Sequence, residues 1–129
     1  MRVIYMELLP VFALGSILYG LTEILWRGWT HWTMLLCGGL CFTLMYLVSG
    51  SELSLVKKWV LSTCIITTVE FVAGCIVNLR LHWQVWDYSS MRFNLLGQIC
   101  PQFVLLWFAL SIPGTALCLL LRRLFTAVR

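Results

Sequence analysis

The chain of 129 residues is long enough for one domain. Its composition of 61% hydrophobic and 11% charged residues, with a mean hydropathy of +0.94, excludes an ordinary soluble domain, in which ~45–50% of residues are apolar and ~25% charged. The net charge of +4 comes from scattered basic residues, so we expect no nucleic-acid surface and relate the charge to membrane topology.

Four apolar segments are long enough to cross a membrane, since ~20 residues of helix span ~30 Å of hydrocarbon. They cover residues 8–26, 32–48, 59–79 and 95–121. None alternates apolar and polar residues as a membrane β-barrel strand does, and backbone groups in lipid must otherwise be satisfied within a helix. The sequence therefore predicts an all-α fold: one transmembrane domain over residues 1–129, built as a four-helix bundle.

The basic residues predict the orientation of this bundle. With four spans, both termini and the second connection share one side, which carries Arg2, Lys57, Lys58, Arg122, Arg123 and Arg129. The other side carries Arg27, Arg80 and Arg92. Because positive charge favours the cytoplasmic side, we expect both termini in the cytoplasm and the connection at residues 80–95 on the outer side.

Glu23 lies about one turn before the end of the first span. A carboxylate at the bilayer centre costs roughly 2.5–3.5 kcal/mol, and less near the interface. Arg27 follows at i+4, a spacing at which two side chains meet on a helix, so one hypothesis is an interfacial ion pair. The other is a proton or cation site that faces the bundle interior, together with Tyr19 one turn earlier.

Glu70 lies near the middle of the third span, far in sequence from any lysine or arginine. It is either protonated or partnered by another span. Thr67, Glu70, Gly74 and Asn78 recur at helical spacing and form a polar stripe, which normally faces other helices or a wet cavity. Hydrogen bonding between helices and the lining of a transport pathway both remain open. The candidate pathway residues are Glu23, Glu70, Asn78 and Tyr19.

The sequence offers little chemistry beyond these carboxyls. The six cysteines show no metal-ligand spacing and are expected to act as small apolar side chains. His31 and His82 are expected to bond Asp87 or backbone carbonyls. Neither a nucleophile–base pair nor a phosphate-binding loop is present, so we expect no enzyme activity, no metal and no cofactor. In the fourth span, Pro113 predicts a kink.

The stretch Leu81–Cys100 is unusually aromatic and polar for a simple connection. Asp87 and the serines after it suit turn or cap bonding, and Arg92 is the expected partner of Asp87. The polar groups of Asn94, Gly97 and Gln98 are expected to begin the fourth helix. The candidate residues are Trp86, Asp87, Tyr88, Ser89, Arg92, Asn94, Gly97 and Gln98. The stretch is either a cap whose polar groups bond one another or a surface that recognises a headgroup, a solute or a partner.

A set of residues over about Gly15 to Ser111 forms a wider pattern. Its members are Glu23, Arg27-Gly28, Glu70, Trp86-Asp87-Tyr88-Ser89, Phe93-Asn94-Leu95, Gly97-Gln98-Ile99-Cys100 and Trp107. This pattern resembles the CmpB-like ABC-transporter type IV family of bacterial membrane proteins. Many members carry a proline-rich Gly-Pro-Phe-Cys-Pro-Ile-Tyr element after the Arg-Gly pair, where this chain has Trp29-Thr30-His31-Trp32-Thr33-Met34, so the chain resembles a short variant.

The resemblance implies a multi-pass protein of the bacterial inner membrane, permease-like and of unassigned substrate. Four spans make a small permease, so we expect a homo-oligomer or a partner membrane protein besides the lipid bilayer. The competing hypothesis is a non-transporting adaptor, in which the acidic residues join helices and the Trp-Asp-Tyr-Ser run is structural or binds a partner. A wet cavity between Glu23, Glu70 and Asp87 would favour transport, and a dry bundle would favour the adaptor.

Overall fold

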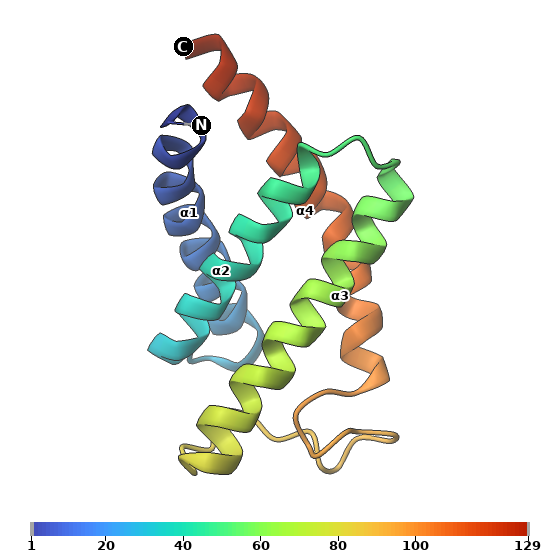
Figure 1. Ribbon diagram of the computed structural model, residues 1–129. Coiled ribbons are helices and arrows are strands. Elements are labelled where there is room, and N and C mark those ends of the chain that lie inside the picture. The colour runs from blue at the N-terminus through green and yellow to red at the C-terminus, as the bar shows by residue number, and fades with distance from the viewer. Residues whose placement is uncertain (1, 129) are drawn as a thin grey trace.

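A computed structural model describes residues 2–128, with side chains from residue 5 onward. The described chain forms the helices α1 (Arg2–Arg27), α2 (Trp32–Ser49), α3 (Leu55–Gly74) and α4 (Pro101–Val128) (Figure 1). A π-helical turn, η1 (Cys75–Arg80), continues α3. All four helices are long and apolar enough to cross a membrane, with α3 and η1 acting as one span. The prediction of an all-α, four-span membrane protein is confirmed.

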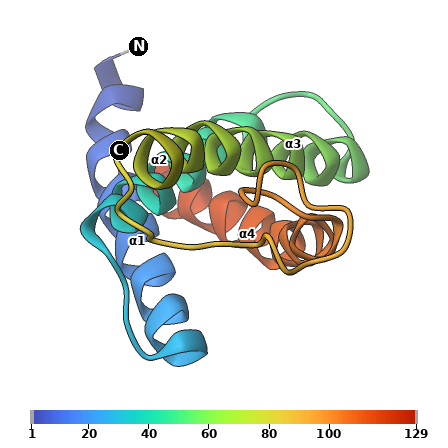
Figure 2. The same ribbon diagram turned by 90° about the horizontal axis from the view of Figure 1, so that it is seen from below.

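Both ends of the chain lie at the same end of the bundle, together with the short connection between α2 and α3 (Figure 1). The long connection, residues 81–100, lies at the opposite end and runs across the lower ends of the helices from η1 to α4 (Figure 2). Which end faces the cytoplasm stays a prediction. Two of the basic residues behind that prediction, Arg2 and Arg129, have side chains outside the described part of the chain.

The fourth helix begins at Pro101, six residues after the start that hydropathy predicts. Leu96 and Gly97 have positive φ values of 55° and 74°, so the backbone there cannot continue a right-handed helix. Proline suits the first helical position because it fixes φ and needs no N–H partner there. Asn94, Gly97 and Gln98 therefore belong to the long connection, and the prediction that they begin the fourth helix is wrong.

Glycines bring α1 and α2 into close contact. A Cβ atom on Gly38 would overlap the Cβ atom of Tyr19, and one on Gly15 would overlap that of Phe42. Small residues at such positions let two helix backbones approach, which is how helices associate in lipid. α1 packs mainly against α2, whereas α4 packs against both α2 and α3. The α1 and α4 backbones do not pack closely along their length, and the two helices meet through side chains such as Tyr19 and Trp107.

The end of α2 is held by basic side chains from α3 and α4. Lys58 donates from Nζ to the Ser49 carbonyl oxygen at 2.9 Å, and Arg122 donates from Nη2 to the Tyr46 carbonyl oxygen at 2.6 Å. The Tyr46 hydroxyl, in turn, hydrogen-bonds the buried Glu7. Cations near a helix C-terminus offset its negative partial charge and satisfy its last carbonyls. Two residues used to predict topology thus also hold the bundle together.

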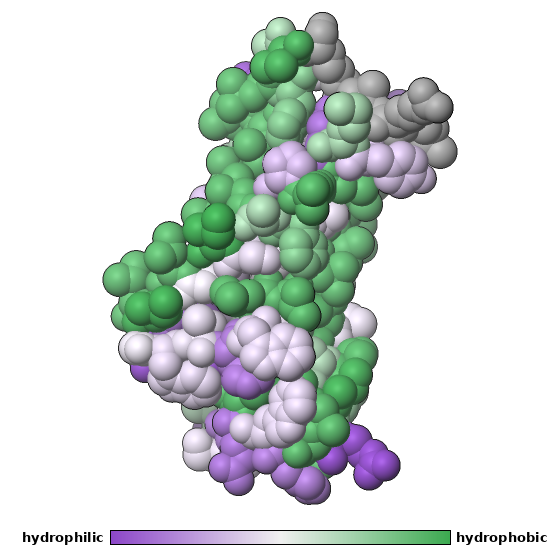
Figure 3. Space-filling model, turned by 90° about the vertical axis from the view of Figure 1, so that its left-hand side faces the viewer, coloured by the Kyte–Doolittle hydropathy of each residue, from purple (hydrophilic) through white to green (hydrophobic). Residues whose placement is uncertain are grey.

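The surface of the bundle is apolar along its middle and polar toward its ends. In Figure 3, hydrophobic residues cover the middle of the visible face, and hydrophilic residues gather at the lower end, where the long connection lies. Large side chains such as Leu9, Leu25 and Leu105 are more than 70% exposed. A surface of this kind is stable in hydrocarbon and not in water.

Candidate functional site

A cavity of about 500 Å³ opens between α1 and α4 and is lined by all four helices and by the long connection. Its floor comes from largely buried residues of α2 and α3, among them Met34, Met45 and Glu70. Its exposed lining comes from α1 and α4, with Leu18 and Leu110 on the two sides. The opening therefore faces sideways, toward the surface that the apolar side chains assign to lipid.

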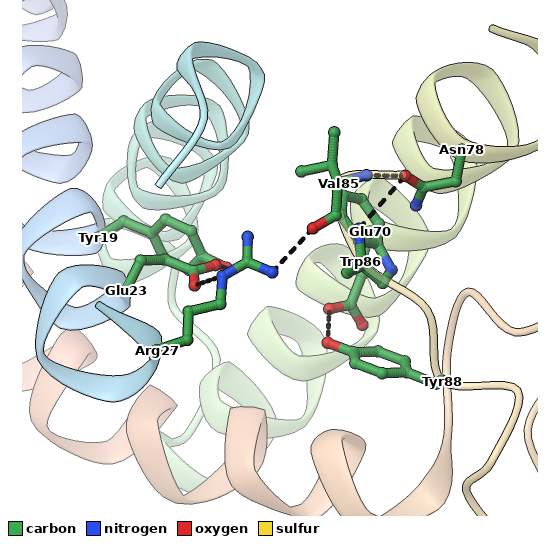
Figure 4. A network of polar contacts seen from close by, with 8 residues as sticks. All are labelled: Tyr19, Glu23, Arg27, Glu70, Asn78, Val85, Trp86 and Tyr88. Atoms are coloured by element: carbon green, nitrogen blue, oxygen red, sulfur yellow. Dashed lines mark hydrogen bonds and ion pairs between the residues drawn. The ribbon is translucent and has the colours of Figure 1, made fainter. Parts of the chain in front are cut away.

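Glu23 enters this cavity from α1 as part of an ion pair. Its Oε2 atom lies 2.8 Å from Nε of Arg27, and its Oε1 atom accepts a hydrogen bond of 2.8 Å from the Tyr19 hydroxyl. Arg27 also donates from Nη1 to the carbonyl oxygen of Val85 at 2.8 Å, which ties α1 to the long connection (Figure 4). The predicted pair at i+4 is confirmed, and its charges cancel within the cavity wall.

Glu70 enters the cavity from α3 and is bonded by neutral donors. The Tyr88 hydroxyl donates to Oε2 at 3.1 Å (Figure 4), and the indole N–H of Trp107 donates to Oε1 at 3.2 Å. The predicted partner from another span is thus Trp107 of α4, with a second partner from the long connection. No lysine, arginine or histidine among the described side chains forms an ion pair with Glu70.

Aromatic rings surround the Glu70 carboxyl. Tyr88 stacks on Phe103 with 4.6 Å between ring centroids and an interplanar angle of 9°. Trp107 lies 6.2 Å from Phe103 and 6.4 Å from Tyr19, measured between centroids. All four rings line the cavity. The site therefore combines a carboxyl group, aromatic faces and an apolar remainder.

Asn78 does not line the cavity, because its side chain is used to hold the long connection. Its Oδ1 atom accepts the backbone N–H of Val85 at 2.7 Å and that of Trp86 at 3.3 Å (Figure 4). Its Nδ2 atom donates to Oε1 of Gln98 at 2.8 Å. Of the predicted polar stripe along α3 and η1, Glu70 alone lines the cavity, and Asn78 joins η1 to the long connection by hydrogen bonds.

Most polar groups of the long connection bond one another. The carbonyl oxygen of Gln98 accepts the Trp86 indole N–H at 3.1 Å. Asn94 donates from Nδ2 to the Met91 carbonyl oxygen and accepts the Gly97 N–H at Oδ1, both at 2.8 Å. A Cβ atom on Gly97 would lie 3.0 Å from the Asp87 carboxylate, so the fold there needs glycine for space as well as for its positive φ.

Asp87 and Arg92 do not form the predicted ion pair. Asp87 accepts the backbone N–H of Ser89 at 2.8 Å, which closes a local turn, while the Arg92 side chain is exposed. The local bond forms because it needs only two residues of chain and leaves both charges in water. His31 is likewise not bonded to Asp87: its Nδ1 atom caps α2 by accepting the Thr33 N–H at 3.3 Å.

Two pKa values in the long connection are shifted by these contacts. Hydrogen bonds from the backbone and hydroxyl of Ser89 hold the pKa of the exposed Asp87 below its usual range. Burial, reinforced by the Glu70 carboxylate, raises the pKa of the Tyr88 phenol above its usual range. Asp87 is thus charged and Tyr88 protonated at neutral pH, as the observed hydrogen bonds require.

Of the site residues that the sequence predicts, five line the cavity: Tyr19, Glu23, Glu70, Trp86 and Tyr88. The others lie outside it: Asn78, Asp87, Ser89, Arg92, Asn94, Gly97 and Gln98. Pro113 and Gly114, which the sequence favours as packing residues of the fourth span, also line the cavity, and so does Phe103, which the sequence does not single out. The sequence does not reveal the role of Phe103, because a phenylalanine that lines a cavity and one that faces lipid look the same within an apolar span. Asp87 lies outside the cavity, so the structure joins the two glutamates but not the aspartate.

The comparisons with known proteins agree with the resemblance in the sequence. A family model described as Putative ABC-transporter type IV matches residues 4–126, which is nearly the whole chain. Searches of curated proteins and of solved structures gave no match.

Proposed function

Because the chain belongs to the ABC-transporter type IV family, we propose that it is a permease-like component of the bacterial inner membrane, with both termini in the cytoplasm. The observation that carries this proposal is the cavity between α1 and α4, which reaches from the outer surface of the bundle to the Glu70 carboxyl. Its size of about 500 Å³ falls within the ~300–1,000 Å³ typical of small-molecule sites.

The solute binds in this cavity beside Glu23 and Glu70 and leaves through the same bundle. Ionisable residues within spans are costly, and they commonly mark substrate or ion pathways. The protein binds and moves its solute and does not react with it. A bundle of four spans has too few helices to enclose a complete pathway, so the working unit is a homo-oligomer or a complex with a second membrane protein.

Flux through reconstituted proteoliposomes tests the proposal. The solute panel contains cationic, anionic and neutral amphiphiles together with small polar solutes. Flux of at least one solute should saturate with concentration, and it should be lost in Leu110→Trp, which fills the opening and leaves Glu70 and its two hydrogen-bond donors unsubstituted. The matched control is Leu105→Trp, which adds the same bulk to a side chain of α4 that is 71% exposed outside the cavity.

A second function, that of a non-transporting adaptor, is supported by the long connection. Its polar groups are largely bonded to one another, as expected of a rigid cap that presents a fixed surface. The same experiment separates the two functions. If the protein is folded and correctly inserted, and every solute crosses these vesicles no faster than protein-free vesicles, the permease is rejected and the adaptor is favoured.

A further inference from the structure

When the Glu70 carboxyl is ionised, the charges in the cavity wall do not balance. Glu23 and Arg27 form an ion pair, and the third charged residue of the lining is Glu70. Its two hydrogen-bond donors, the Tyr88 hydroxyl and the Trp107 indole, carry no formal charge. A carboxylate so placed in a medium of low dielectric constant attracts a cation more strongly than it would in water. The cavity is thus complementary to one positive charge.

The surroundings of Glu70 specify what kind of cation fits. The rings of Tyr19, Tyr88, Phe103 and Trp107 line the cavity with it. Aromatic faces attract cations through their negative quadrupole, and rings grouped around one point bind alkylated ammonium groups. A small hydrated metal ion gains little from such a wall, because the cavity offers it few oxygen ligands. A cation with apolar substituents matches both the charge and the rings.

Most of the remaining cavity lining is apolar. Away from Glu70 the cavity is lined by Leu18, Phe42, Ile66, Leu110 and Leu117. The exposed lining belongs to α1 and α4, so a molecule reaches the cavity from the bilayer without crossing the long connection. Molecules that partition into hydrocarbon would therefore have direct access.

We propose that this cavity binds an amphiphilic cation, in which a single ammonium-like charge lies against Glu70 and the rings around it, and an apolar body fills the space between α1 and α4. The statement that this cation is the transported solute rests on the proposed function. The statement that the cavity binds such a cation depends only on the cavity and its lining. The positive group can belong to a free lipophilic cation or to the headgroup of an ethanolamine or choline lipid.

Equilibrium dialysis of the full chain in maltoside micelles tests the proposal with two probes of matched shape. Tetraphenylphosphonium carries a positive charge, and tetraphenylborate carries a negative one. The phosphonium should bind saturably and at least tenfold more tightly than the borate. Equal affinity for the two probes would show that the cavity selects only apolar bulk, and it would overturn the proposal.

Variants of the protein show which carboxylate is needed for phosphonium binding. Glu70→Gln should weaken phosphonium binding at least tenfold, while Glu70→Asp should retain most of it. Asp87→Asn is the matched control, because Asp87 is an exposed carboxylate of the long connection that lies outside the cavity. Asparagine keeps the side-chain oxygen that accepts the Ser89 N–H. If Glu70→Gln does not fold, Leu110→Trp should abolish phosphonium binding by filling the opening. Equal loss in Asp87→Asn, or undiminished binding in Leu110→Trp, would contradict the assignment.

Competition in nanodiscs identifies the source of the cation. If ethanolamine or choline lipids displace the phosphonium and phosphatidylglycerol does not, the positive group that the cavity binds is that of a lipid headgroup. Phosphonium unaffected by any of these lipids would identify a free cation, and both outcomes keep the proposal. The flux panel separates this inference from the proposed function. Phosphonium binding without any flux would support the cation site and reject the proposed transport. Flux of neutral or anionic solutes without phosphonium binding would support transport and reject the cation site.

Discussion

The indole N–H of Trp107 on α4 donates to the Glu70 carboxyl on α3 across 3.2 Å, joining residues 37 positions apart in the sequence. Both side chains are more than 90% buried. Because no water replaces a lost donor readily in such a place, the bond fixes how α3 and α4 pack beside the cavity. It also makes the carboxyl part of the wall and not a mobile group.

Replacing Trp107 by Phe should destabilise the bundle. The change keeps an aromatic ring but leaves the Oε1 atom of Glu70 without its donor, and an unsatisfied buried acceptor costs about 1–3 kcal/mol. The free energy of unfolding in mixed dodecyl sulfate–maltoside micelles measures the effect. Trp59→Phe is the control, because Trp59 is half-buried on α3 and makes an edge-on contact with Phe108 instead of bonding Glu70. Equal losses in the two variants would contradict the role assigned to the Trp107 N–H.

Replacing Gly38 by Ala should separate α1 from α2. The added Cβ atom would overlap the Cβ atom of Tyr19 and lie 2.8 Å from its ring, so the backbone of α1 must move, at a cost of about 1–3 kcal/mol. The melting temperature in micelles should fall. Ala13→Leu, which adds apolar volume to the exposed face of α1, should leave the melting temperature nearly unchanged. A Gly38→Ala protein as stable as the natural one would show that the helices are not in close contact.

Replacing Asn78 by Leu should loosen the long connection without unfolding the helices. The variant loses the acceptor for the Val85 and Trp86 amides and the donor to Gln98. Hydrogen–deuterium exchange should become faster in peptides covering residues 83–98 and stay unchanged in those covering 36–46. Uniformly faster exchange, or no change at all, would contradict the view that Asn78 holds this connection.

The raised pKa of Tyr88 predicts that stability falls in alkali. Below about pH 10, the ordinary pKa of tyrosine, both folded and unfolded chains keep the phenol protonated, so its contribution to stability is fully present. Above that pH the unfolded chain loses the proton while the folded chain keeps it, and the free energy of unfolding decreases. Unfolding measured between pH 9 and 11.5 should show a shallower decrease in Tyr88→Phe than in the natural protein. Identical slopes would contradict the prediction.

Local spacing and hydropathy were enough to predict the spans and the ion pair in α1. Glu23 and Arg27 meet because four residues of helix bring them together, whatever the rest of the chain does. The start of α4 was missed because Leu95 and Leu96 are as apolar as the helix that follows, and hydropathy does not register a positive φ. Tertiary structure overrode the local signal there.

The contacts that define the cavity could not be read from the sequence. Glu70 meets Tyr88 and Trp107, and Asn78 meets Gln98, at separations of 18, 37 and 20 residues. One residue pattern on α3 predicted that Glu70 and Asn78 act on the same face, but it could not show that one lines a cavity and the other holds a connection. Which of the two residues lines the cavity depends on how far apart the α1 and α4 backbones lie, and local spacing does not encode that distance.

Binding of small molecules between α1 and α4, beside Glu70, can be observed in a crystal structure of the protein with tetraphenylarsonium. The arsenic atom of this probe is located by its anomalous scattering. We predict one dominant arsenic peak inside the cavity, next to the Glu70 carboxyl and the Tyr88 ring. Arsenic peaks confined to the outer surface of the helices or to the long connection, with the cavity empty of probe, would show that small molecules do not bind beside Glu70.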